Sequence, residues 1–409
     1  MTDASVLHND GFRRLFISAA LVIFGVMSQA VARGWLAREL TGTNAGLGGV
    51  MLVFGLAMLL ATPWGGVAAD RLPKRTLLVA AVGALTLSSL LMGLAVVVGV
   101  DRYWMLLVAG GVQAVAFAFY LPARIAFITE LIDADRVPEA ITMSQTAQEG
   151  VRVFGPALAG VLIGVGWFGT GGVFLLAAAT GLLSGVVLFG LPPGEPRHRS
   201  ERSPLAELAD GVAYVRRTPW LGLIAITTIV VVIATFPYLT FLPALADERF
   251  DVGAGGYGVM SGVAGLGAVV AGLAGPRWAR MVRHPWITVA VSAVVLGAAV
   301  AVLGLVANFW VALVVLAVIG AASLVFQTTT LSLMLSLADI EYHGRLQSMV
   351  VLGFSGFGLA ALPLGALADA TSMRLVLGLM GLVAMAVGVL FASRRRRARR
   401  SRKVGIELA

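Results

Sequence analysis

Twelve long apolar runs, separated by short polar joints, dominate this sequence of 409 residues. A helix needs about 20 mainly apolar residues to cross the hydrocarbon core of a bilayer, and each run reaches that length. The joints leave room for little beyond helical hairpins, and the sequence lacks the period-two alternation of a membrane barrel. We therefore expect an all-α integral membrane protein with twelve transmembrane helices. Their expected limits are 15–38, 46–69, 76–99, 104–127, 140–164, 170–191, 219–244, 256–279, 286–307, 309–337, 346–368 and 373–393.

The composition excludes several classes of protein. Charged residues make up 12% of the chain, against about 25% in soluble domains, and the mean hydropathy is +0.93. With no cysteine and four scattered histidines, the sequence offers no disulfide and no metal-ligand spacing. It also lacks a phosphate-binding loop and a nucleophile–base set, so we expect no enzyme, no cofactor, no metal and no direct drive by ATP.

The basic residues predict the orientation in the membrane. With the N-terminus inside, 23 of the 30 lysines and arginines lie in inner segments, 4 in outer joints and 3 within spans. This bias predicts a multi-pass protein of the cell membrane with both ends in the cytoplasm. The basic tail at 394–403 follows the last run directly, which is typical of a segment beside anionic lipid and not of a nucleic-acid-binding segment.

The longest polar stretch, 192–218, divides the runs into two sets of six and contains an amphipathic piece near 205–215. The segments 131–135 and 337–341 resemble each other, and Pro156 and Pro363 follow them at an offset of 207. Internal duplication of a six-span unit is typical of transporters, whose substrate site lies between the halves. We expect an N-terminal bundle at 1–191, a cytoplasmic linker at 192–218, a C-terminal bundle at 219–393 and a basic tail at 394–409.

A charged joint follows the second run, where residues 66–75 read Gly-Val-Ala-Ala-Asp-Arg-Leu-Pro-Lys-Arg. A charge cluster at helix ends can latch a bundle in one of two states, whereas basic residues alone would indicate only the inner side of the membrane. The stretch resembles the G-x-x-x-D-R-x-G-R-R loop of the major facilitator superfamily, with Pro73 in place of the second glycine. This resemblance implies a cytoplasmic gate made by Gly66, Asp70, Arg71, Lys74 and Arg75.

The fifth run carries a second motif. Its Gly150, Gly155, Pro156 and Gly160 resemble the Gly-Pro motif of the superfamily's exporters. Further matches to the branch that includes the enterobactin exporter and macrolide efflux proteins lie at 35–36, 40–42, 122–124, 130–131 and 344–347. The resemblance covers the whole chain and implies two pseudo-symmetric six-helix bundles that export by alternating access. The arginine in the fourth span of proton-coupled drug antiporters is not visible here, since Gln113 is the main polar residue in the middle of that span.

Glu149 is the only acidic residue that we expect near the middle of the membrane. On a helix it shares one stripe with Gln145, Arg152, Pro156 and Gly160. Apolar surroundings favour the neutral acid, whereas Arg152 one turn away favours the carboxylate, and this balance suits a proton carrier. Two other roles stay open, namely a permanent Glu149–Arg152 ion pair that holds the helix and a contact to the substrate.

Gln29 and Arg33, one turn apart in the first run, form a second polar pair in an apolar setting. Arg33 either binds an anionic group of the substrate or extends its side chain toward the outer interface, and the sequence favours the second role. Further candidates for contact with the substrate or with protons are Gln113, Tyr120, Gln145, Tyr238, Gln327 and Thr328.

We conclude from the sequence that the chain is a secondary active transporter. We expect proton-coupled efflux of a hydrophobic or amphiphilic small molecule, such as a drug, a macrolide or a siderophore. Protons and membrane lipid are then its partners, and nucleic acid is not. Two alternatives remain: import of a small metabolite, which reverses the direction of flux, and a non-transporting sensor or scaffold, which would not depend on Glu149.

Overall fold

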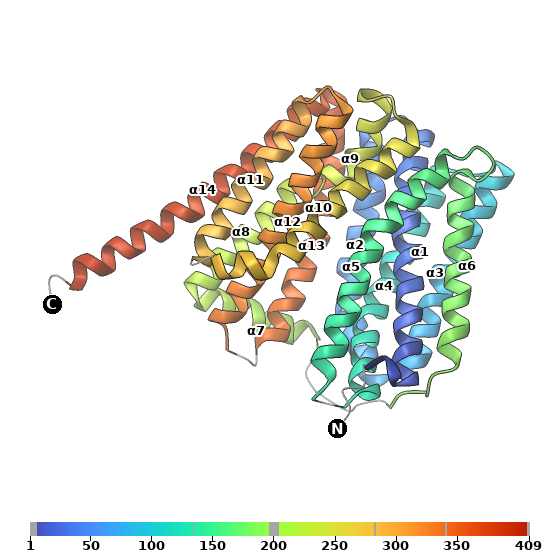
Figure 1. The fold of residues 1–409 in the computed structure, drawn as a ribbon, viewed down its shortest axis with the longest axis horizontal. Helices are drawn as coiled ribbons and strands as arrows, with labels where there is room; N and C mark the ends of the chain where they lie inside the picture. Colours follow the sequence, from blue (N-terminus) through green and yellow to red (C-terminus); the bar gives the residue numbers. More distant parts are fainter. Residues whose placement is uncertain (1–5, 134, 196–203, 282–283, 340–341, 407–409) are drawn as a thin grey trace. The chain divides into compact units, whose positions relative to one another are not determined.

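The computed structural model describes residues 6–133, 135–195, 204–281, 284–339 and 342–406. Within these ranges some side chains, among them those of Glu149 and Arg152, lie outside the description. All regular structure in the described residues is helical (Figure 1), which confirms the expected all-α class.

Most of the helices are long, and short joints connect each one to the next. The earlier ones are η1 (Val6–His8), α1 (Asp10–Thr41), α2 (Asn44–Arg71), α3 (Lys74–Val98), α4 (Tyr103–Leu131), α5 (Val137–Gly164) and α6 (Gly169–Phe189). The later ones are α7 (Pro204–Arg217), α8 (Pro219–Thr235), α9 (Tyr238–Ala244), η2 (Leu245–Arg249), α10 (Gly253–Met281), α11 (Pro285–Leu305), α12 (Phe309–Leu337), α13 (His343–Ala370) and α14 (Met373–Ile406).

The apolar helices occupy the positions of the twelve predicted runs. Ten stretches in the described residues are long and apolar enough to cross a membrane, and Pro219–Arg249 counts as one of them. Two shorter apolar stretches, Phe154–Gly164 and Gly356–Ala370, belong to α5 and α13. Together they confirm the twelve predicted membrane segments.

The seventh segment differs from the prediction of one helix over 219–244. α8 ends at Thr235, a turn at 236–237 follows, and α9 begins at Tyr238. Pro237 lies in this turn, and proline removes the backbone N–H that a continuous helix would need. The chain then passes through the π-helical turn η2, in which the Phe250 N–H donates to the Leu245 carbonyl at 3.1 Å.

Local hydrogen bonds set both ends of α1. At the start, the Asn9 side chain accepts the Phe12 N–H at 2.9 Å. At the end, Gly42 adopts a left-handed conformation with φ of 63° and donates its N–H to the Arg38 carbonyl at 2.8 Å. Glycine adopts this conformation without the steric cost of a Cβ atom. α1 therefore ends in a fixed turn with Arg38 in its last turn.

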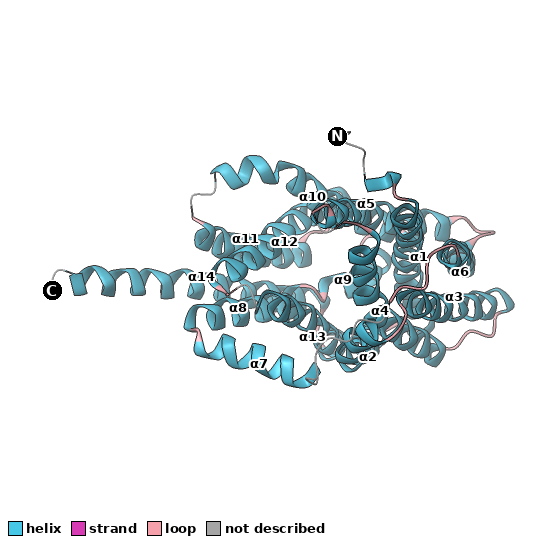
Figure 2. Cartoon of the chain, turned by 90° about the horizontal axis from the view of Figure 1, so that it is seen from below, coloured by secondary structure: helices cyan, strands magenta, loops and turns pink. Residues whose placement is uncertain are grey.

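The backbone divides into two compact units. Unit 1 comprises Met1–Ala206 and Thr240–Gly262, and unit 2 comprises Glu207–Leu239 and Val263–Ala409. Thus η2 and the first turns of α10 belong with α1 to α6, although they follow the predicted linker in sequence. In unit 1, α3 packs against α4 and α6, and α1 packs against α5 and α6 (Figure 2). The bundle limits drawn from the sequence stay a prediction.

In unit 2, α11 packs against α12 and α14, and α8 packs against α13 and α14. The amphipathic piece expected near 205–215 is α7. Its Tyr214 stacks on Tyr342 with ring centroids 3.8 Å apart, and the Tyr214 hydroxyl donates to the Asp339 carboxylate at 3.1 Å. These contacts fix α7 to the joint between α12 and α13.

α2 and α4 approach backbone to backbone at Gly65. A Cβ atom added to Gly65 would lie 2.0 Å from the Ala118 carbonyl oxygen, a distance that atoms do not tolerate. The next residue, Gly66, has no described atom within 4 Å of the same added Cβ. Small residues at helix contacts let membrane helices come this close.

We predict that Gly65→Ala destabilises the protein by about 1–3 kcal/mol, because the added methyl overpacks the α2–α4 contact. The measurement is the melting temperature of the purified protein in detergent, followed by tryptophan fluorescence. Gly66→Ala is the matched control, and we expect it to be neutral or slightly stabilising because alanine favours helix over glycine. Equal melting of Gly65→Ala and wild type would contradict the contact.

Candidate functional site

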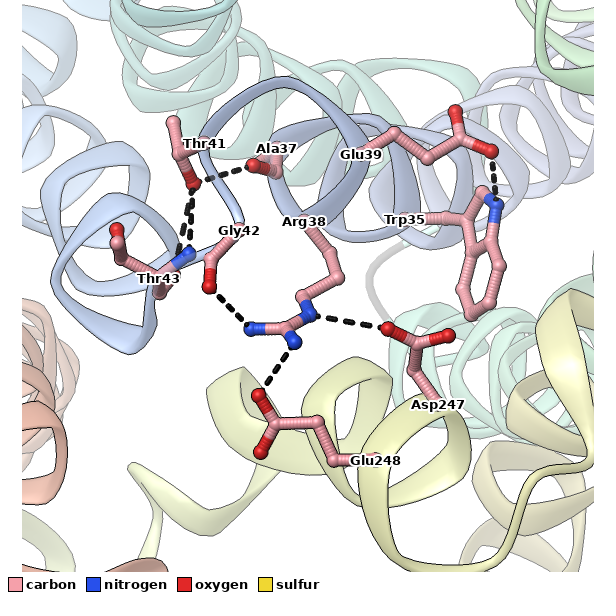
Figure 3. Close-up of polar contacts among 9 residues, drawn as sticks. All are labelled: Trp35, Ala37, Arg38, Glu39, Thr41, Gly42, Thr43, Asp247 and Glu248. Carbon is pink, nitrogen blue, oxygen red and sulfur yellow. Dashed lines mark hydrogen bonds and ion pairs between the residues drawn. The ribbon is translucent and has the colours of Figure 1, made fainter.

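A charge cluster joins the end of α1 to η2 within unit 1 (Figure 3). The Arg38 guanidinium binds three acceptors: Asp247 through Nε at 3.2 Å, Glu248 through Nη2, and the Gly42 carbonyl through Nη1 at 2.8 Å. The Arg38 side chain is 10% exposed, whereas those of Asp247 and Glu248 are 47% and 49% exposed. We call Arg38, Asp247 and Glu248 the α1 latch.

The turn that ends α1 places Arg38 in this cluster. The Thr41 hydroxyl donates to the Ala37 carbonyl at 2.7 Å, and Thr43 caps α2 by accepting the Gly46 N–H at 3.1 Å. Between them, Gly42 turns its carbonyl toward Arg38 (Figure 3). Because solvent reaches both carboxylates, screening weakens the two ion pairs, and the latch is a contact that can open.

α5 makes two close contacts at glycines, and we call them the α5 seam. A Cβ atom on Gly155 would lie 3.1 Å from the Met27 Cβ of α1. A Cβ atom on Gly160 would lie 2.2 Å from the Gly258 Cα of α10. Two of the four residues in the predicted exporter motif therefore lie at close contacts of α5 in unit 1. A Cβ atom on Gly150 meets no described atom within 4 Å, and Pro156 lies inside the helix.

Arg33 is enclosed by protein, so the expectation that it extends to the outer interface is wrong. Its side chain is 3% exposed, and its guanidinium lies 6.0 Å from the ring centre of Phe54 in α2. A Cβ atom on Gly110 of α4 would lie 3.3 Å from the Arg33 Nη1. A long side chain on α1 can meet neighbouring helices in place of the membrane surface, and the sequence does not reveal which of the two occurs.

Gln29 does not pair with Arg33. Its Oε1 accepts a hydrogen bond from the Ser89 hydroxyl of α3 at 3.0 Å, and both side chains are buried. The two residues of the predicted polar pair thus contact different helices: Gln29 faces α3, and Arg33 faces α2 and α4. This arrangement makes Gln29 a packing contact inside unit 1.

One face of α4 carries three buried polar side chains. Gln113, Tyr120 and Arg124 are 2%, 0% and 3% exposed, and their spacings of seven and four residues place them on one side of the helix. Both amide atoms of Gln113 and the Tyr120 hydroxyl have no hydrogen-bond partner among the described residues. Arg124 belongs to the motif match at 122–124 but was not selected as a site residue, although its spacing from Gln113 and Tyr120 was visible in the sequence.

The remaining predicted contact residues are placed separately in the two units. In unit 1, Gln145 of α5 is exposed. In unit 2, Tyr238 is buried, Gln327 is half-buried, and Thr328 is exposed with its hydroxyl bonded to the Leu324 carbonyl at 2.8 Å. The side chains of Glu149 and Arg152, which were predicted to carry protons or to pair, lie outside the described part. Whether these residues line one cavity stays a prediction.

Two residues of the predicted cytoplasmic gate hold the chain that leaves α6. Lys74 is 1% exposed and forms an ion pair with Glu130 of α4 at 2.9 Å. Its Nζ also donates to the Glu195 carbonyl. Arg75 donates through Nη1 to the Leu191 carbonyl at 2.8 Å, and its N–H donates to the Pro193 carbonyl at 3.1 Å.

These bonds tie the segment after α6 to the ends of α3 and α4 inside unit 1. Asp70 and Arg71 have exposed side chains. The gate role of these two residues and of Gly66 stays a prediction. The sequence analysis did not select Glu130 as a partner, because the pair joins residues 56 positions apart in two different helices.

Comparison with known families and proteins identifies the class of protein to which the chain is similar. The family model described as Major Facilitator Superfamily matches residues 15–363. The uncharacterized MFS-type transporter YfiS of Bacillus subtilis (strain 168) is 29% identical over 181 residues, which span 42% of this chain and 41% of that protein. The match thus covers less than half the length of this relative.

Several solved transporter structures are similar in fold. The nucleoside transporter NupG has a TM-score of 0.70 at 14% identity, over 93% of this chain and 98% of that chain. A POT family transporter in complex with 5-aminolevulinic acid has a TM-score of 0.75 at 12% identity, over 94% and 95%. A bacterial homolog of the human lysosomal transporter Spinster has a TM-score of 0.71 at 14% identity, over 95% and 95%. At these identities the likeness concerns the fold alone.

We predict that Lys74→Met destabilises the protein strongly, by about 3 kcal/mol, because it leaves the Glu130 carboxylate without its partner in a largely buried position. Thermal unfolding in detergent measures the effect. Arg71→Met is the matched control, since it removes an exposed positive charge from the same joint, and we expect little change. Similar melting of the two variants would contradict a structural role for Lys74.

We predict that loss of the α1 latch opens the contact between α1 and η2. The chain has no cysteine, so Ala254→Cys adds a single reporter at a buried position beside the α5 seam. Adding Asp247→Asn and Glu248→Gln should raise its labelling rate with a maleimide several-fold. Asp101→Asn is the control carboxylate outside the latch and should leave the rate unchanged. An unchanged rate in the latch variant would show that other contacts hold the seam.

Proposed function

The chain belongs to the Major Facilitator Superfamily and is a multi-pass membrane transporter, and from this premise we propose that it exports a small molecule by alternating access. The proposed cargo is hydrophobic or amphiphilic, in the manner of a drug, a macrolide or a siderophore, as the resemblance to the enterobactin-exporter and macrolide-efflux branch implies. The proposed driving force is the inward flow of protons.

One observation carries the outward direction. The exporter-like glycines Gly155 and Gly160 lie where α5 closely approaches α1 and α10. At Gly160 and Gly258 the two backbones meet, and helices that touch in this way can separate and meet again without repacking side chains. The α5 seam is therefore suited to a contact that closes one end of the site and opens in the other state.

The bias of the basic residues supports the same direction. It assigns the C-terminal end of α1, where the α1 latch lies, to the outside of the cell. A transporter whose outer end is held by the latch and by the α5 seam loads its cargo from the cytoplasm or from the bilayer. Opening of these contacts then releases the cargo outward.

Proton coupling is assigned to Glu149, in the middle of α5. In the turn before it, Gln148 is 5% exposed and donates through Nε2 to the Ser144 carbonyl at 2.9 Å, whereas Gln145 and Thr146 are exposed. A carboxyl group on a transmembrane helix can bind and release a proton as its surroundings change between two states. A fixed pair with Arg152 is the alternative role, and the experiment below separates the two.

We predict that substrate drives protons out of inside-out vesicles that contain the protein. The vesicle interior is made acidic and carries a pH dye, and lipophilic cations, macrolides and siderophores are added in turn. An exporter raises the interior pH when its substrate enters. Glu149→Gln should abolish this change, because the glutamine cannot carry a proton.

Glu139→Gln is the matched control. It changes the same residue type in the first turn of α5, where Glu139 is exposed and bonds only its near neighbour Arg136 among the described contacts. Proton release that persists in Glu149→Gln would make Glu149 a structural partner of Arg152. Substrate movement in the opposite direction would identify an importer, and a folded protein that moves no compound of the panel would contradict the proposed cargo class.

A further inference from the structure

Arg33 is a buried cation without a carboxylate partner among the described residues. Its side chain is 3% exposed, and its Nε has no hydrogen-bond partner among the described residues. The described groups around it include the Phe54 ring, Gly110 of α4 and the phenol of Tyr257. No acidic side chain in the described part pairs with Arg33.

A second buried polar side chain without a described hydrogen-bond partner, that of Gln113, lies near Gly110 on α4. It is 2% exposed, and neither its amide nitrogen nor its amide oxygen has a partner among the described residues. It lies one turn after Gly110, where an added Cβ atom would lie 3.3 Å from the Arg33 Nη1. Long side chains on a helix point back toward its N-terminus, and from this rule we infer that the Gln113 amide extends toward the turn of Gly110.

These two groups are costly for the folded protein. Removal of an unpaired charge from water is strongly unfavourable, and each buried polar group without a hydrogen bond adds to the cost. Apolar residues of similar volume would fill α1 and α4 without that cost. Ionisable side chains kept inside a membrane bundle normally face a ligand pathway or a partner charge. The missing partner of Arg33 is therefore expected on the cargo.

We propose that Arg33 and Gln113 form an anion-binding subsite, and that the cargo is an amphiphilic carboxylate. This inference rests on the proposed export function and names the chemical class of its cargo. One guanidinium balances a single negative charge and binds both oxygens of a carboxylate with two parallel N–H bonds. A phosphate dianion would need a second cation, and none is described beside Arg33. Phe54 supplies an apolar surface for the body of the molecule.

The position of the subsite suits release at the latched end of α1. Arg33 lies five residues before Arg38, which is about 7.5 Å along the helix. The next residue, Gly34, packs against Tyr257, with 3.0 Å between an added Cβ atom and the Tyr257 hydroxyl. When the α1 latch opens and Tyr257 moves off Gly34, Arg33 is the first buried charge that water reaches. Hydration of the guanidinium then weakens its hold on the carboxylate.

The test measures binding and does not depend on transport. The full-length protein in detergent is titrated with 4-phenylbutyrate or with its neutral amide, 4-phenylbutanamide, and the melting temperature is recorded. We expect the acid to raise the melting temperature of wild type, and the amide to leave it unchanged. Arg33→Met should weaken acid binding by about tenfold or more. Arg102→Met, which removes an exposed arginine at the start of α4, should bind the acid as wild type does.

A second readout separates a binding role from a structural one. Without ligand, Arg33→Met and Gln113→Leu should melt at the same temperature as wild type or higher, since each removes an unsatisfied buried group. If Arg33→Met does not fold, Gln113→Leu carries the test, with acid binding weakened several-fold. Equal binding of acid by Arg33→Met and wild type, equal shifts by acid and amide, or no shift of wild type by the acid would each overturn the subsite.

The two proposals fail in different ways. Proton-coupled export of neutral compounds that Arg33→Met leaves intact would overturn the subsite and keep the export function. Binding of the acid that depends on Arg33, in a protein that moves no compound outward, would keep the subsite and overturn the export function.

Discussion

The structure depends on one constraint, the absence of water around the backbone of a membrane-spanning chain. Each peptide group in the hydrocarbon core must find its hydrogen bond within the protein, so each long apolar run forms a helix. Lipid tails are as apolar as leucine, and the helices therefore associate through close packing. This close packing is seen where Gly65 meets Ala118 and where Gly160 meets Gly258, because at both points helix backbones meet without a side chain between them. The seam proposed to open during export is thus built from the same type of contact that holds α2 on α4.

The charged residues in unit 1 differ in how completely they are satisfied. Lys74 is buried but has Glu130 and a carbonyl as partners, so it serves the stability of the joint after α6. Arg38 is satisfied by two half-exposed carboxylates, which makes its contact weak enough to open. Arg33 is buried as deeply as Lys74 and has no carboxylate among the described residues. A folded protein gains nothing from such a group, and this is the physical reason for assigning Arg33 to the cargo.

Hydropathy predicted the helices closely, because the length of an apolar run is a local property. The expected run 309–337 and the observed α12 (Phe309–Leu337) coincide. The break after Thr235 was missed although Pro237 was visible, because an apolar run can conceal a turn. The candidate site was predicted in part. Arg33 and Gln113 were selected as buried polar residues, but the predicted Gln29–Arg33 pair was wrong, since Ser89 of α3 binds Gln29.

The sequence by itself determined the class, the number of membrane segments and the family, because apolar length, charge bias and motif spacing are properties of short stretches. Only the tertiary structure decided which polar groups meet. Arg38 and Asp247 are 209 residues apart, and nothing local in either segment indicates that they pair. The same holds for Gly160 and Gly258, and for Arg33 and the turn at Gly110. These contacts arise from the packing of whole helices, and that packing determines which charges find a partner among the described residues and which one we propose for the cargo.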